Sequence, residues 1–511
     1  MDFPRHYNAA GDFIDRNVDA GLADKPAFID PTRSLTYGEL ARAARQMGNV
    51  LAGLDVDREA RVALLMHDTV DWPVAFWGAI RAGVVPVAIN TMLGPAQYEY
   101  MLADSRAQVL FVSHALLAQV EPCLDRLPRL RHVIVAGGEA AGRPSFTDLV
   151  SQAIPEFETA DTCADEVAFW LYSSGSTGDP KGTQHVHSSL KVTADTYGRQ
   201  VLGIRPDDVV LSAAKLFFAY GLGNSMSFPM SVGATTILCP ERPTPAAIFK
   251  LLNQHDPSLF FGVPTLYAAM LADPNCTPEN GSRKLRLCVS AGEALPADIG
   301  RAWQKRFGVD ILDGVGSTEM LHIYLSTRPG DVRHGTCGKP VPGYAVRLVD
   351  EAGHEVGPEE IGEMLVDGQS AAAGYWHQRA KSRATFEGRW TRTGDKYVRD
   401  ADGYYRICGR TDDMFKVSGI WVSPFEVEAA LTGHPLVLEA AVVPKADPDG
   451  LLKPKAFVVL KAGNASDELA AELKEHVKAA IGQWKYPRWI EFLETLPKTA
   501  TGKIQRFKLR D

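Results

Sequence analysis

The chain has 511 residues, of which 45% are hydrophobic and 23% are charged, and its formal net charge is −8. This length exceeds one ordinary hydrophobic core, so we expect two or more domains, and the composition is typical of a globular protein. The acidic balance argues against a general nucleic-acid binder. Seven scattered cysteines without a C-x-x-C spacing indicate neither a disulfide framework nor a structural zinc site.

No segment of the sequence predicts export or membrane insertion. The first residues lack a long apolar signal core, and Arg81 interrupts the most apolar stretch, 72–89, before it reaches membrane-spanning length. We therefore expect a soluble, cytoplasmic protein without a membrane partner.

Strand and helix patterns alternate through the first two-thirds of the chain. A capping-box pattern, Thr36-Tyr37-Gly38-Glu39, begins a predicted helix that ends near residue 54. Strands and helices are then predicted in turn at 61–66, 70–82, 84–89, 98–105 and 109–112. This alternation predicts an α/β fold with mostly parallel sheets. In such folds ligands bind at the carboxyl ends of the strands, so we expect a ligand-binding site there.

From about Thr336 the sequence changes to β-hairpin patterns, with a turn at Asp400-Ala401-Asp402-Gly403. The charged segment Gly409-Arg410-Thr411-Asp412-Asp413 then precedes a compact α+β pattern. We expect a large N-terminal domain at 1–411 that contains a β-rich subdomain, and a small mobile C-terminal domain at 412–511.

One segment has the composition of a phosphate-binding loop: Tyr172-Ser173-Ser174-Gly175-Ser176-Thr177-Gly178-Asp179-Pro180-Lys181-Gly182. Glycine lets backbone N–H groups approach an anion, Ser and Thr add donors, and Lys adds a positive charge. The segment is not a P-loop, because that pattern has Lys directly before Ser or Thr. Taken alone, it is equally compatible with a flexible surface turn.

Five separated motifs, in this order, resemble those of the adenylate-forming superfamily of acyl-CoA synthetases, adenylation domains and luciferase-type enzymes. They are the loop at 172–182, Asp313-Gly314-Val315-Gly316-Ser317-Thr318-Glu319, Trp390-Thr391-Arg392-Thr393-Gly394-Asp395, Gly409–Asp413 with Lys416 and Gly419, and Pro497-Lys498-Thr499-Ala500-Thr501-Gly502-Lys503. Within the superfamily, 213–224 and 317–323 resemble benzoate-type aryl-CoA ligases. The stretch Tyr7-Asn8-Ala9-Ala10 is more similar to hydroxybenzoate ligases, so the ring substituent stays open.

The resemblance implies a two-step reaction that uses ATP, Mg²⁺ and CoA in the degradation of aromatic compounds. The carboxylate of benzoate or a simple substituted benzoate, such as hydroxybenzoate, attacks the α-phosphorus and gives an aroyl-adenylate and pyrophosphate. The CoA thiolate then displaces AMP. The alternatives are an adenylating enzyme that loads an aryl acid onto a carrier-protein thiol, and a non-enzymatic nucleotide sensor. A homodimer is compatible with the sequence.

The resemblance assigns the groups around the phosphates and the metal. Thr318 would contact phosphate and Glu319 would hold Mg²⁺, a cation that prefers hard oxygen ligands. Taken alone, these two residues would be a helix N-cap and a first-turn acid. The residues that would hold the β- and γ-phosphates are Ser173, Ser174, Gly175, Ser176, Thr177, Gly178 and Lys181.

The nucleoside contacts are also implied by the resemblance. Asp395, in a tight Thr-Gly-Asp turn, would accept hydrogen bonds from the ribose hydroxyls, and Arg410 would support the same ribose. Taken alone, Asp395 is a turn residue and Arg410 is half of a surface ion pair. The residues that would line the adenine are Gly292, Glu293, Ala294, Asp313 and Gly314.

The C-terminal motifs would divide the two half-reactions. Lys503 would bridge the substrate carboxylate and the α-phosphate, where negative charge accumulates; the alternative is one more cation in a basic tail. Acetylation of Lys503 by an acetyltransferase, reversed by a deacetylase, would remove this charge. Asp412 would be the hinge, Lys416 would assist thioester formation, and Gly419 would let the pantetheine approach the backbone.

An aromatic-rich segment would form the acyl pocket, since an apolar slot suits a flat ring. The candidates are Phe218, Ala219, Tyr220, Gly221, Gly314, His322 and Ile323. Phe217 and Phe218 are alternatively core residues, and His322 is alternatively a structural histidine. The His185-Val186-His187 alternation resembles a metal pair but has no third ligand nearby in the sequence.

Overall fold

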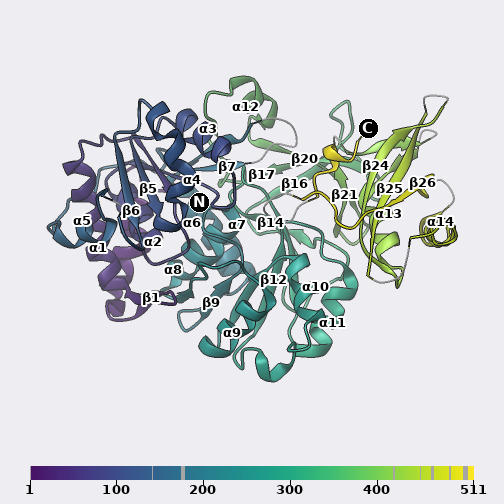
Figure 1. Cartoon of the computed structure of the whole chain (residues 1–511), viewed down its shortest axis with the longest axis horizontal. Helices are drawn as coiled ribbons and strands as arrows, with labels where there is room; N and C mark the ends of the chain where they lie inside the picture. The colour runs from purple at the N-terminus through teal and green to yellow at the C-terminus, as the bar shows by residue number, and fades with distance from the viewer. Residues whose placement is uncertain are drawn as a thin grey trace. The chain divides into compact units, whose positions relative to one another are not determined.

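The computed structural model describes residues 2–140, 142–173, 179–411, 413–417, 420–448, 451–461, 465–482, 485–498 and 504–510. The predicted site residues Asp412, Gly419, Lys503 and 174–178 lie outside this set, and the side chain of Lys416 is not described. Internal contacts divide the chain (Figure 1) into a first unit of Met1–His334, Gly338–Ala345 and Asp367–Thr391 and a second of Gly335–Cys337, Val346–Val366 and Arg392–Asp511. The predicted division at 411/412 stays a prediction.

A seven-stranded sheet lies in the first unit, in the order β18-β8-β7-β4-β3-β5-β6. Its strands are β3 (Arg61–Leu65), β4 (Val85–Ala88), β5 (Val109–Ser113), β6 (His132–Ala136), β7 (Val167–Ser173), β8 (Lys181–Val186) and β18 (Gly374–Tyr375). The pairs among β7, β4, β3, β5 and β6 are parallel, while β8 runs antiparallel to both β7 and β18. Side chains of β4 and β5 are buried throughout, as expected for central parallel strands.

The first unit also holds a nine-stranded sheet, in the order β15-β14-β13-β12-β11-β9-β10-β1-β2. Its strands are β1 (Pro26–Ile29), β2 (Ser34–Thr36), β9 (Val209–Ser212), β10 (Thr235–Ile237), β11 (Leu259–Gly262), β12 (Leu287–Ala291), β13 (Ile311–Gly316), β14 (Ile323–Ser326) and β15 (Lys339–Pro340). The strands from β1 to β13 along this order are parallel, and β2, β14 and β15 are antiparallel additions at the edges. The predicted α/β fold with mostly parallel sheets is confirmed.

The helices of the first unit connect these strands. Among the described residues they are α1 (Tyr37–Gly53), α2 (Asp71–Arg81), α3 (Pro95–Ser105), α4 (His114–Val120), α5 (Phe146–Gln152), α6 (His187–Thr193), α7 (Ala219–Leu222), α8 (Phe228–Val232), α9 (Pro245–His255), α10 (Pro264–Ala272), α11 (Ala297–Phe307) and α12 (Arg379–Thr385). The predicted capping box at the start of α1 is present: the Glu39 N–H donates to Thr36 Oγ1 over 3.2 Å, and the Thr36 N–H donates to the Glu39 carboxylate over 2.8 Å.

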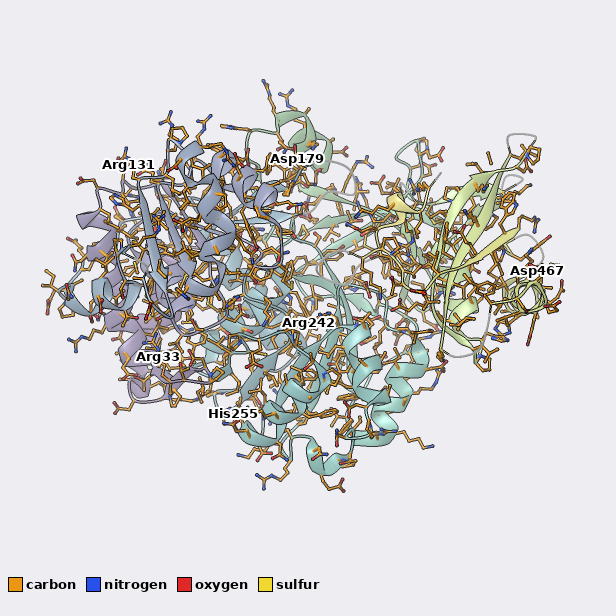
Figure 2. All side chains as sticks on the ribbon, viewed as in Figure 1. Arg33, Arg131, Asp179, Arg242, His255 and Asp467 are labelled. Carbon is orange, nitrogen blue, oxygen red and sulfur yellow. The ribbon has the colours of Figure 1, made fainter. Side chains whose placement is uncertain are left out.

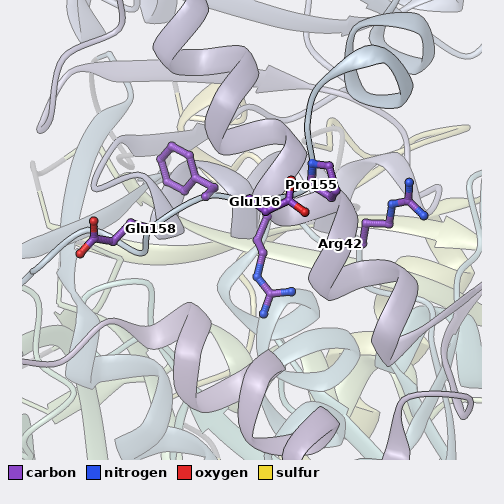
Figure 3. Close-up of a pocket in the computed structure, with 6 residues that line it drawn as sticks. Arg42, Pro155, Glu156 and Glu158 are labelled. Atoms are coloured by element: carbon purple, nitrogen blue, oxygen red, sulfur yellow. The ribbon is translucent and has the colours of Figure 1, made fainter.

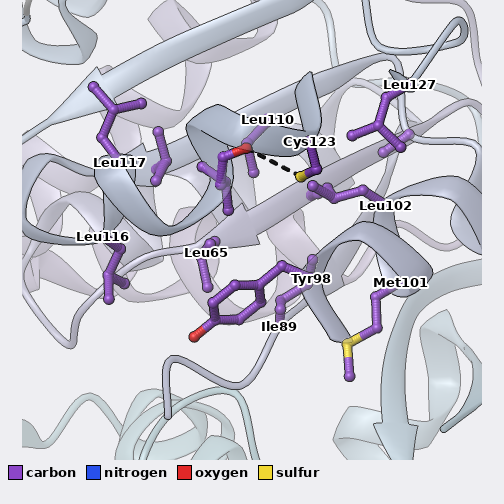
Figure 4. Packing of buried hydrophobic residues seen from close by; sticks show 14 of the residues in the cluster. Leu65, Ile89, Tyr98, Met101, Leu102, Leu110, Leu116, Leu117, Cys123 and Leu127 are labelled. Atoms are coloured by element: carbon purple, nitrogen blue, oxygen red, sulfur yellow. Dashed lines mark hydrogen bonds between the residues drawn. The ribbon is translucent and has the colours of Figure 1, made fainter. Parts of the chain in front are cut away.

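A buried cluster packs between the seven-stranded sheet and helices α3 and α4 (Figure 4). Leu110 of β5, Tyr98 of α3 and Leu116 of α4 are at most 4% exposed. Cys123 belongs to the same cluster, and its thiol donates to the Val120 carbonyl over 3.0 Å. Burial of such side chains stabilises the fold by about 1.5–3 kcal/mol each.

The second unit contains short β-sheets and a compact α+β region. Strands β16 (Ala345–Val349), β17 (Ile361–Asp367), β20 (Trp390–Arg399) and β21 (Tyr405–Arg410) are successive neighbours. Strand β19 (Phe386–Glu387) pairs with Trp390 and Thr391 at the start of β20, and these residues belong to the first unit. The remaining elements are β22 (Phe415–Val417), β23 (Ile420–Val422), α13 (Pro424–Thr432), β24 (Val437–Ala446), β25 (Leu452–Leu460), α14 (Asp467–Ile481) and β26 (Trp489–Phe492). Their own apolar core includes Val427, Val442 and Leu473, all fully buried.

Charged side chains are directed outward, as Figure 2 shows for Arg131, Asp179 and Asp467, which are exposed. A search of the helices in the described part of the chain finds none that is long and apolar enough to cross a membrane.

Candidate active site

Strands β7 and β8 bring the two ends of the predicted phosphate loop together. Ser173, the last residue of β7, is paired with Lys181, the first residue of β8. Helix α3 contacts both ends of the loop, since the Tyr100 hydroxyl donates to the Pro180 carbonyl over 3.2 Å and the Tyr172 hydroxyl donates to Asp104 Oδ2 over 2.7 Å. The loop is therefore anchored at its base on a buried sheet and a helix.

A cluster of polar and charged side chains lies at this base; we call Lys181, Glu319 and Tyr375 the charge cluster. Lys181 Nζ lies 3.8 Å from Glu319 Oε1, and the two side chains are 19% and 16% exposed. The Tyr375 hydroxyl donates to Glu319 Oε1 over 2.8 Å, and Lys181 Nζ donates to the same hydroxyl over 3.3 Å. Ser173 Oγ also donates to Glu319 Oε1, over 3.5 Å. The structure thus brings three predicted site residues, Ser173, Lys181 and Glu319, together.

Sequence reasoning missed Tyr375. It lies 56 residues after Glu319, on β18, and its side chain is buried at 6% exposure. The dipeptide Gly374-Tyr375 has no feature that marks a site by itself. The pairing of β18 with β8 places Tyr375 beside Lys181, so its position depends on tertiary structure and no local sequence pattern could have predicted it.

The segment 317–322 connects β13 to β14 and is not the first turn of a helix, so the N-cap interpretation of Thr318 and Glu319 is wrong. The Thr318 carbonyl lies 2.8 Å from His185 Nε2, and the Glu319 carbonyl accepts from the Ala372 N–H over 2.8 Å. These contacts hold the backbone at Thr318 and Glu319.

Of the predicted acyl-pocket residues, Tyr220 lies against a buried histidine, His322. His322 is 2% exposed, and its Nε2 lies 3.2 Å from both the Tyr220 carbonyl and Asn224 Oδ1, so an Nε2–H tautomer satisfies either acceptor. Burial lowers the pKa of His322 to about 3, so the ring is neutral at physiological pH. In the described part of the chain, His322 Nδ1 has no hydrogen-bond partner.

Close packing shapes the same wall. A Cβ on Gly223 would lie 2.3 Å from His322 Cδ2, and one on Gly314 would lie 2.6 Å from Ile323 Cδ1. A Cβ on Gly221 would lie 2.0 Å from the Lys215 carbonyl oxygen, which explains why only glycine fits there. Phe217 is a core residue at 3% exposure, whereas Phe218, Ala219 and Tyr220 are half-buried and keep accessible surface.

The residues predicted to line the adenine lie at neighbouring strand ends. Ser290 and Ala291 of β12 are paired in parallel with Asp313 and Gly314 of β13, and Gly292, Glu293 and Ala294 directly follow β12. Asp313 is 6% exposed, and burial raises its pKa to about 8. The carboxyl ends of parallel strands are where open α/β folds place ligands.

Asp395 and Arg410 face each other on β20 and β21, in the second unit. Asp395 is paired with Arg410, and Asp395 Oδ1 lies 3.3 Å from Arg410 Nη1. Asp395 therefore belongs to a strand, and the expectation of a tight turn is wrong. The preceding residue, Gly394, has a φ of +71°, a backbone conformation that favours glycine.

The residues on either side of the Lys503 segment are held firmly. Lys498 and Ile504 form an isolated antiparallel bridge, and the Gln505 N–H donates to the Pro497 carbonyl over 2.8 Å. Arg506 makes two hydrogen bonds to Glu428 of α13, at 3.0 and 2.7 Å. The described residues that flank the Lys503 segment, Lys498 and Ile504, are thus paired with each other, and Lys503 itself lies outside the described residues.

A surface depression and the two histidines His185 and His187 lie apart from the predicted site residues or have other contacts. A depression of about 750 Å³ beside α1 is lined by Arg42, Arg45, Pro155, Glu156, Phe157 and Glu158 (Figure 3), none of them predicted site residues. His185 stacks on Phe169 and His187 Nδ1 accepts from the Ala9 N–H, so both histidines have structural contacts. Among the described residues no group of three or more His, Cys, Asp or Glu side chains could hold a metal ion.

The comparisons define the class of this protein. Residues 14–376 match the AMP-binding enzyme family, and residues 426–503 match the AMP-binding enzyme C-terminal domain. The chain therefore belongs to the AMP-binding enzyme family, as its motifs predict.

Within this family, the chain is highly similar to several ligases of aromatic acids. The chain is 58% identical to a 4-hydroxybenzoate–CoA/benzoate–CoA ligase of Rhodopseudomonas palustris, over 99% of this chain and 94% of the relative. It is 57% identical to a benzoate–CoA ligase of Thauera aromatica, over 99% and 96%. Among solved structures, a benzoate CoA ligase from Burkholderia xenovorans LB400 matches with a TM-score of 0.92 and 51% identity, over 99% of this chain and all of that one. The predicted resemblance to benzoate- and hydroxybenzoate-CoA ligases is confirmed.

Proposed function

We propose that this chain converts benzoate or a simple hydroxybenzoate to its CoA thioester, as an AMP-forming acid–thiol ligase with ATP and CoA as substrates. The observation that carries the proposal is the 58% identity to a ligase of that name over 99% of the chain. The neutral wall around His322 supports an uncharged aromatic ring as the group that is bound.

The proposed reaction has two steps. A carboxylate oxygen forms a bond to the α-phosphorus, the bond from that phosphorus to the bridging oxygen breaks, and pyrophosphate leaves with the electron pair. The CoA thiolate then attacks the carbonyl carbon, and AMP leaves with the former carboxylate oxygen. Because a carboxylate is a weak nucleophile, we expect positioning and neutralisation of phosphate charge to supply most of the catalysis.

The charge cluster and its loop fit the phosphate side of this reaction. Lys181 supplies a positive charge for the β- and γ-phosphates, and Thr318 is the predicted phosphate contact. In the part of the chain that the structure describes, only Oε1 of Glu319 accepts hydrogen bonds, so Oε2 remains for a hard cation. One carboxylate oxygen with substrate phosphates is a typical Mg²⁺ environment, and bound Mg²⁺ would neutralise phosphate charge.

The remaining roles follow the motif resemblance. Asp395 and Arg410 bind the ribose, and Gly292, Glu293, Ala294, Asp313 and Gly314 line the adenine. Lys503 acts in adenylation and Lys416 with Gly419 in thioester formation, with Asp412 as the hinge between the two arrangements. Phe218, Ala219, Tyr220, Gly221, Gly314, His322 and Ile323 surround the ring.

The proposal also covers acetylation of Lys503, cellular location and oligomeric state. Acetylation of Lys503 removes the charge that stabilises the α-phosphate, so a fully acetylated enzyme that keeps its adenylation rate would contradict this. A cytoplasmic location belongs to the same proposal and is tested by fractionating cells that express the chain. A homodimer is tested by light scattering on the purified chain.

The purified chain should release AMP and form an aroyl thioester with ATP, CoA and at least one acid from a panel of benzoate and its 2-, 3- and 4-hydroxy derivatives. Acetate and cyclohexanecarboxylate serve as non-aromatic controls. No AMP with any aromatic acid would overturn the proposal. Adenylate formation without transfer to free CoA would favour loading of a carrier-protein thiol.

A further inference from the structure

Tyr375 bridges the two oppositely charged members of the charge cluster. Its hydroxyl donates to Glu319 Oε1 over 2.8 Å, and because its one proton is used there, it accepts from Lys181 Nζ over 3.3 Å. Lys181 Nζ also lies 4.3 Å from the centre of the Tyr375 ring. The direct distance from Lys181 Nζ to Glu319 Oε1, 3.8 Å, is longer than either of these hydrogen bonds.

The segment that carries Tyr375 is hydrogen-bonded to both segments that carry these charges. Tyr375 is paired with Thr183 of β8, and the Trp376 N–H donates to the Gly182 carbonyl over 2.8 Å, next to Lys181. Three residues before Tyr375, the Ala372 N–H donates to the Glu319 carbonyl over 2.8 Å. The segment 372–376 therefore fixes the Lys181 strand and the Glu319 loop at once.

We propose that Tyr375 is a positioning residue for the phosphates of ATP, an inference that rests on the proposed function. Its hydroxyl separates Lys181 from Glu319 and holds the carboxylate in place, so that Lys181 can turn to phosphate and Glu319 Oε2 can meet the phosphate-bound cation. Without the hydroxyl, the ammonium and carboxylate can close into a direct ion pair, which the incoming nucleotide must break.

Two properties make tyrosine suited to this role. A charge-assisted hydrogen bond to a carboxylate is stronger than a neutral one, so the hydroxyl competes well with the ammonium for Glu319. The buried ring also gives Lys181 a favourable cation–π contact. Phenylalanine would retain the ring contact and lose both hydrogen bonds.

The test is Tyr375→Phe, measured by equilibrium binding of an ATP analogue that cannot release pyrophosphate, α,β-methylene-ATP with Mg²⁺. We expect about 10-fold weaker binding of this analogue, from the loss of the two hydrogen bonds to charged groups, which the direct ion pair offsets in part. AMP binding and conversion of supplied aroyl-AMP to thioester should change less than about twofold, because neither involves the β- and γ-phosphates. A general structural defect would weaken all three.

Tyr7→Phe is the matched control. The Tyr7 hydroxyl donates to Asp12 Oδ2 over 2.9 Å, so this variant also loses a tyrosine–carboxylate hydrogen bond in the first unit, outside the charge cluster. It should bind the analogue as the wild type does. Adding Glu319→Gln to each parent completes a double-mutant cycle, and Tyr375→Phe should cost little more once Glu319 is neutral.

Two outcomes would overturn the inference: wild-type affinity of Tyr375→Phe for the analogue, or equal losses for the analogue, AMP and thioester formation. These binding measurements do not depend on which acid is activated. If the wild type binds the nucleotide but activates no aromatic acid, the proposed function fails and the assignment of Tyr375 is still tested.

Discussion

The charge cluster is built in the opposite way from the region around His322 with Tyr220, Gly223 and Asn224, which we call the acyl wall; both lie in the first unit. Lys181 and Glu319 are charged, partly exposed and paired with each other through Tyr375. The acyl wall is neutral, and His322 is held by a carbonyl and an amide in a buried site. Under the proposed function, the first arrangement exchanges partners when phosphates bind, whereas the second presents a fixed shape. Phosphate binding should therefore respond to charge changes, and acid selection to changes of volume.

The largest expected effect comes from removing the charge at the α-phosphate. Lys503→Ala should lower aromatic-acid-dependent pyrophosphate exchange by about 100- to 1,000-fold, because charge stabilisation of the transition state is lost. Conversion of supplied aroyl-AMP to thioester should continue. Lys498→Ala is the control, since it removes a lysine of the same segment that is ion-paired to Glu439. Exchange retained in Lys503→Ala would show that the assignment is wrong.

Lys416→Ala should impair thioester formation and spare adenylation, the reverse of Lys503→Ala. We expect thioester formation from aroyl-AMP to fall by about 10- to 100-fold, as for loss of a group that assists transfer, while pyrophosphate exchange stays within about twofold. Rapid-quench measurement of each half-reaction separates the two. Equal losses in both half-reactions would contradict a division of labour between Lys416 and Lys503.

A volume change should act on the acyl wall alone. Gly223→Ala places a methyl group 2.3 Å from His322 Cδ2, and overpacking of this kind costs about 1–3 kcal/mol. The KM for the aromatic acid should rise by about 5- to 100-fold with little change in the KM for ATP. Gly53→Ala, where a Cβ meets nothing within 4 Å, should leave both constants unchanged. A larger change in the KM for ATP would break the distinction between the two regions.

The smallest effect concerns pH. Burial lowers the pKa of His322 to about 3, against about 6.5 in the unfolded chain, so only the unfolded state binds this proton between those values. The contribution of His322 to stability is therefore complete above pH 6.5 and decreases as the pH falls, by about 2 kcal/mol at pH 5. Urea unfolding should show a weaker loss on acidification for His322→Asn than for the wild type. An identical pH dependence would contradict a buried neutral His322.

Much of this picture follows from local sequence. The strand and helix alternation, the phosphate loop and the Thr318–Glu319 motif are each contained in a short segment, and the structure places Ser173, Lys181 and Glu319 together as expected. Tyr375 could not be predicted, because its role depends on β18 pairing with β8, across 194 residues from Lys181. Asp395 was expected in a turn because Thr-Gly-Asp is typical of one, yet pairing with β21 keeps it in a strand. The packing of Gly223 against His322 is likewise a tertiary constraint.

The most direct test of the central claim follows oxygen through the reaction. Benzoate labelled with ¹⁸O in both carboxylate oxygens is incubated with the chain, ATP, Mg²⁺ and CoA, and the products are analysed by mass spectrometry. The account predicts AMP with one ¹⁸O and a benzoyl thioester with one ¹⁸O, because the attacking oxygen leaves with AMP. Unlabelled AMP, or ADP in place of AMP, would contradict formation of an aroyl-adenylate.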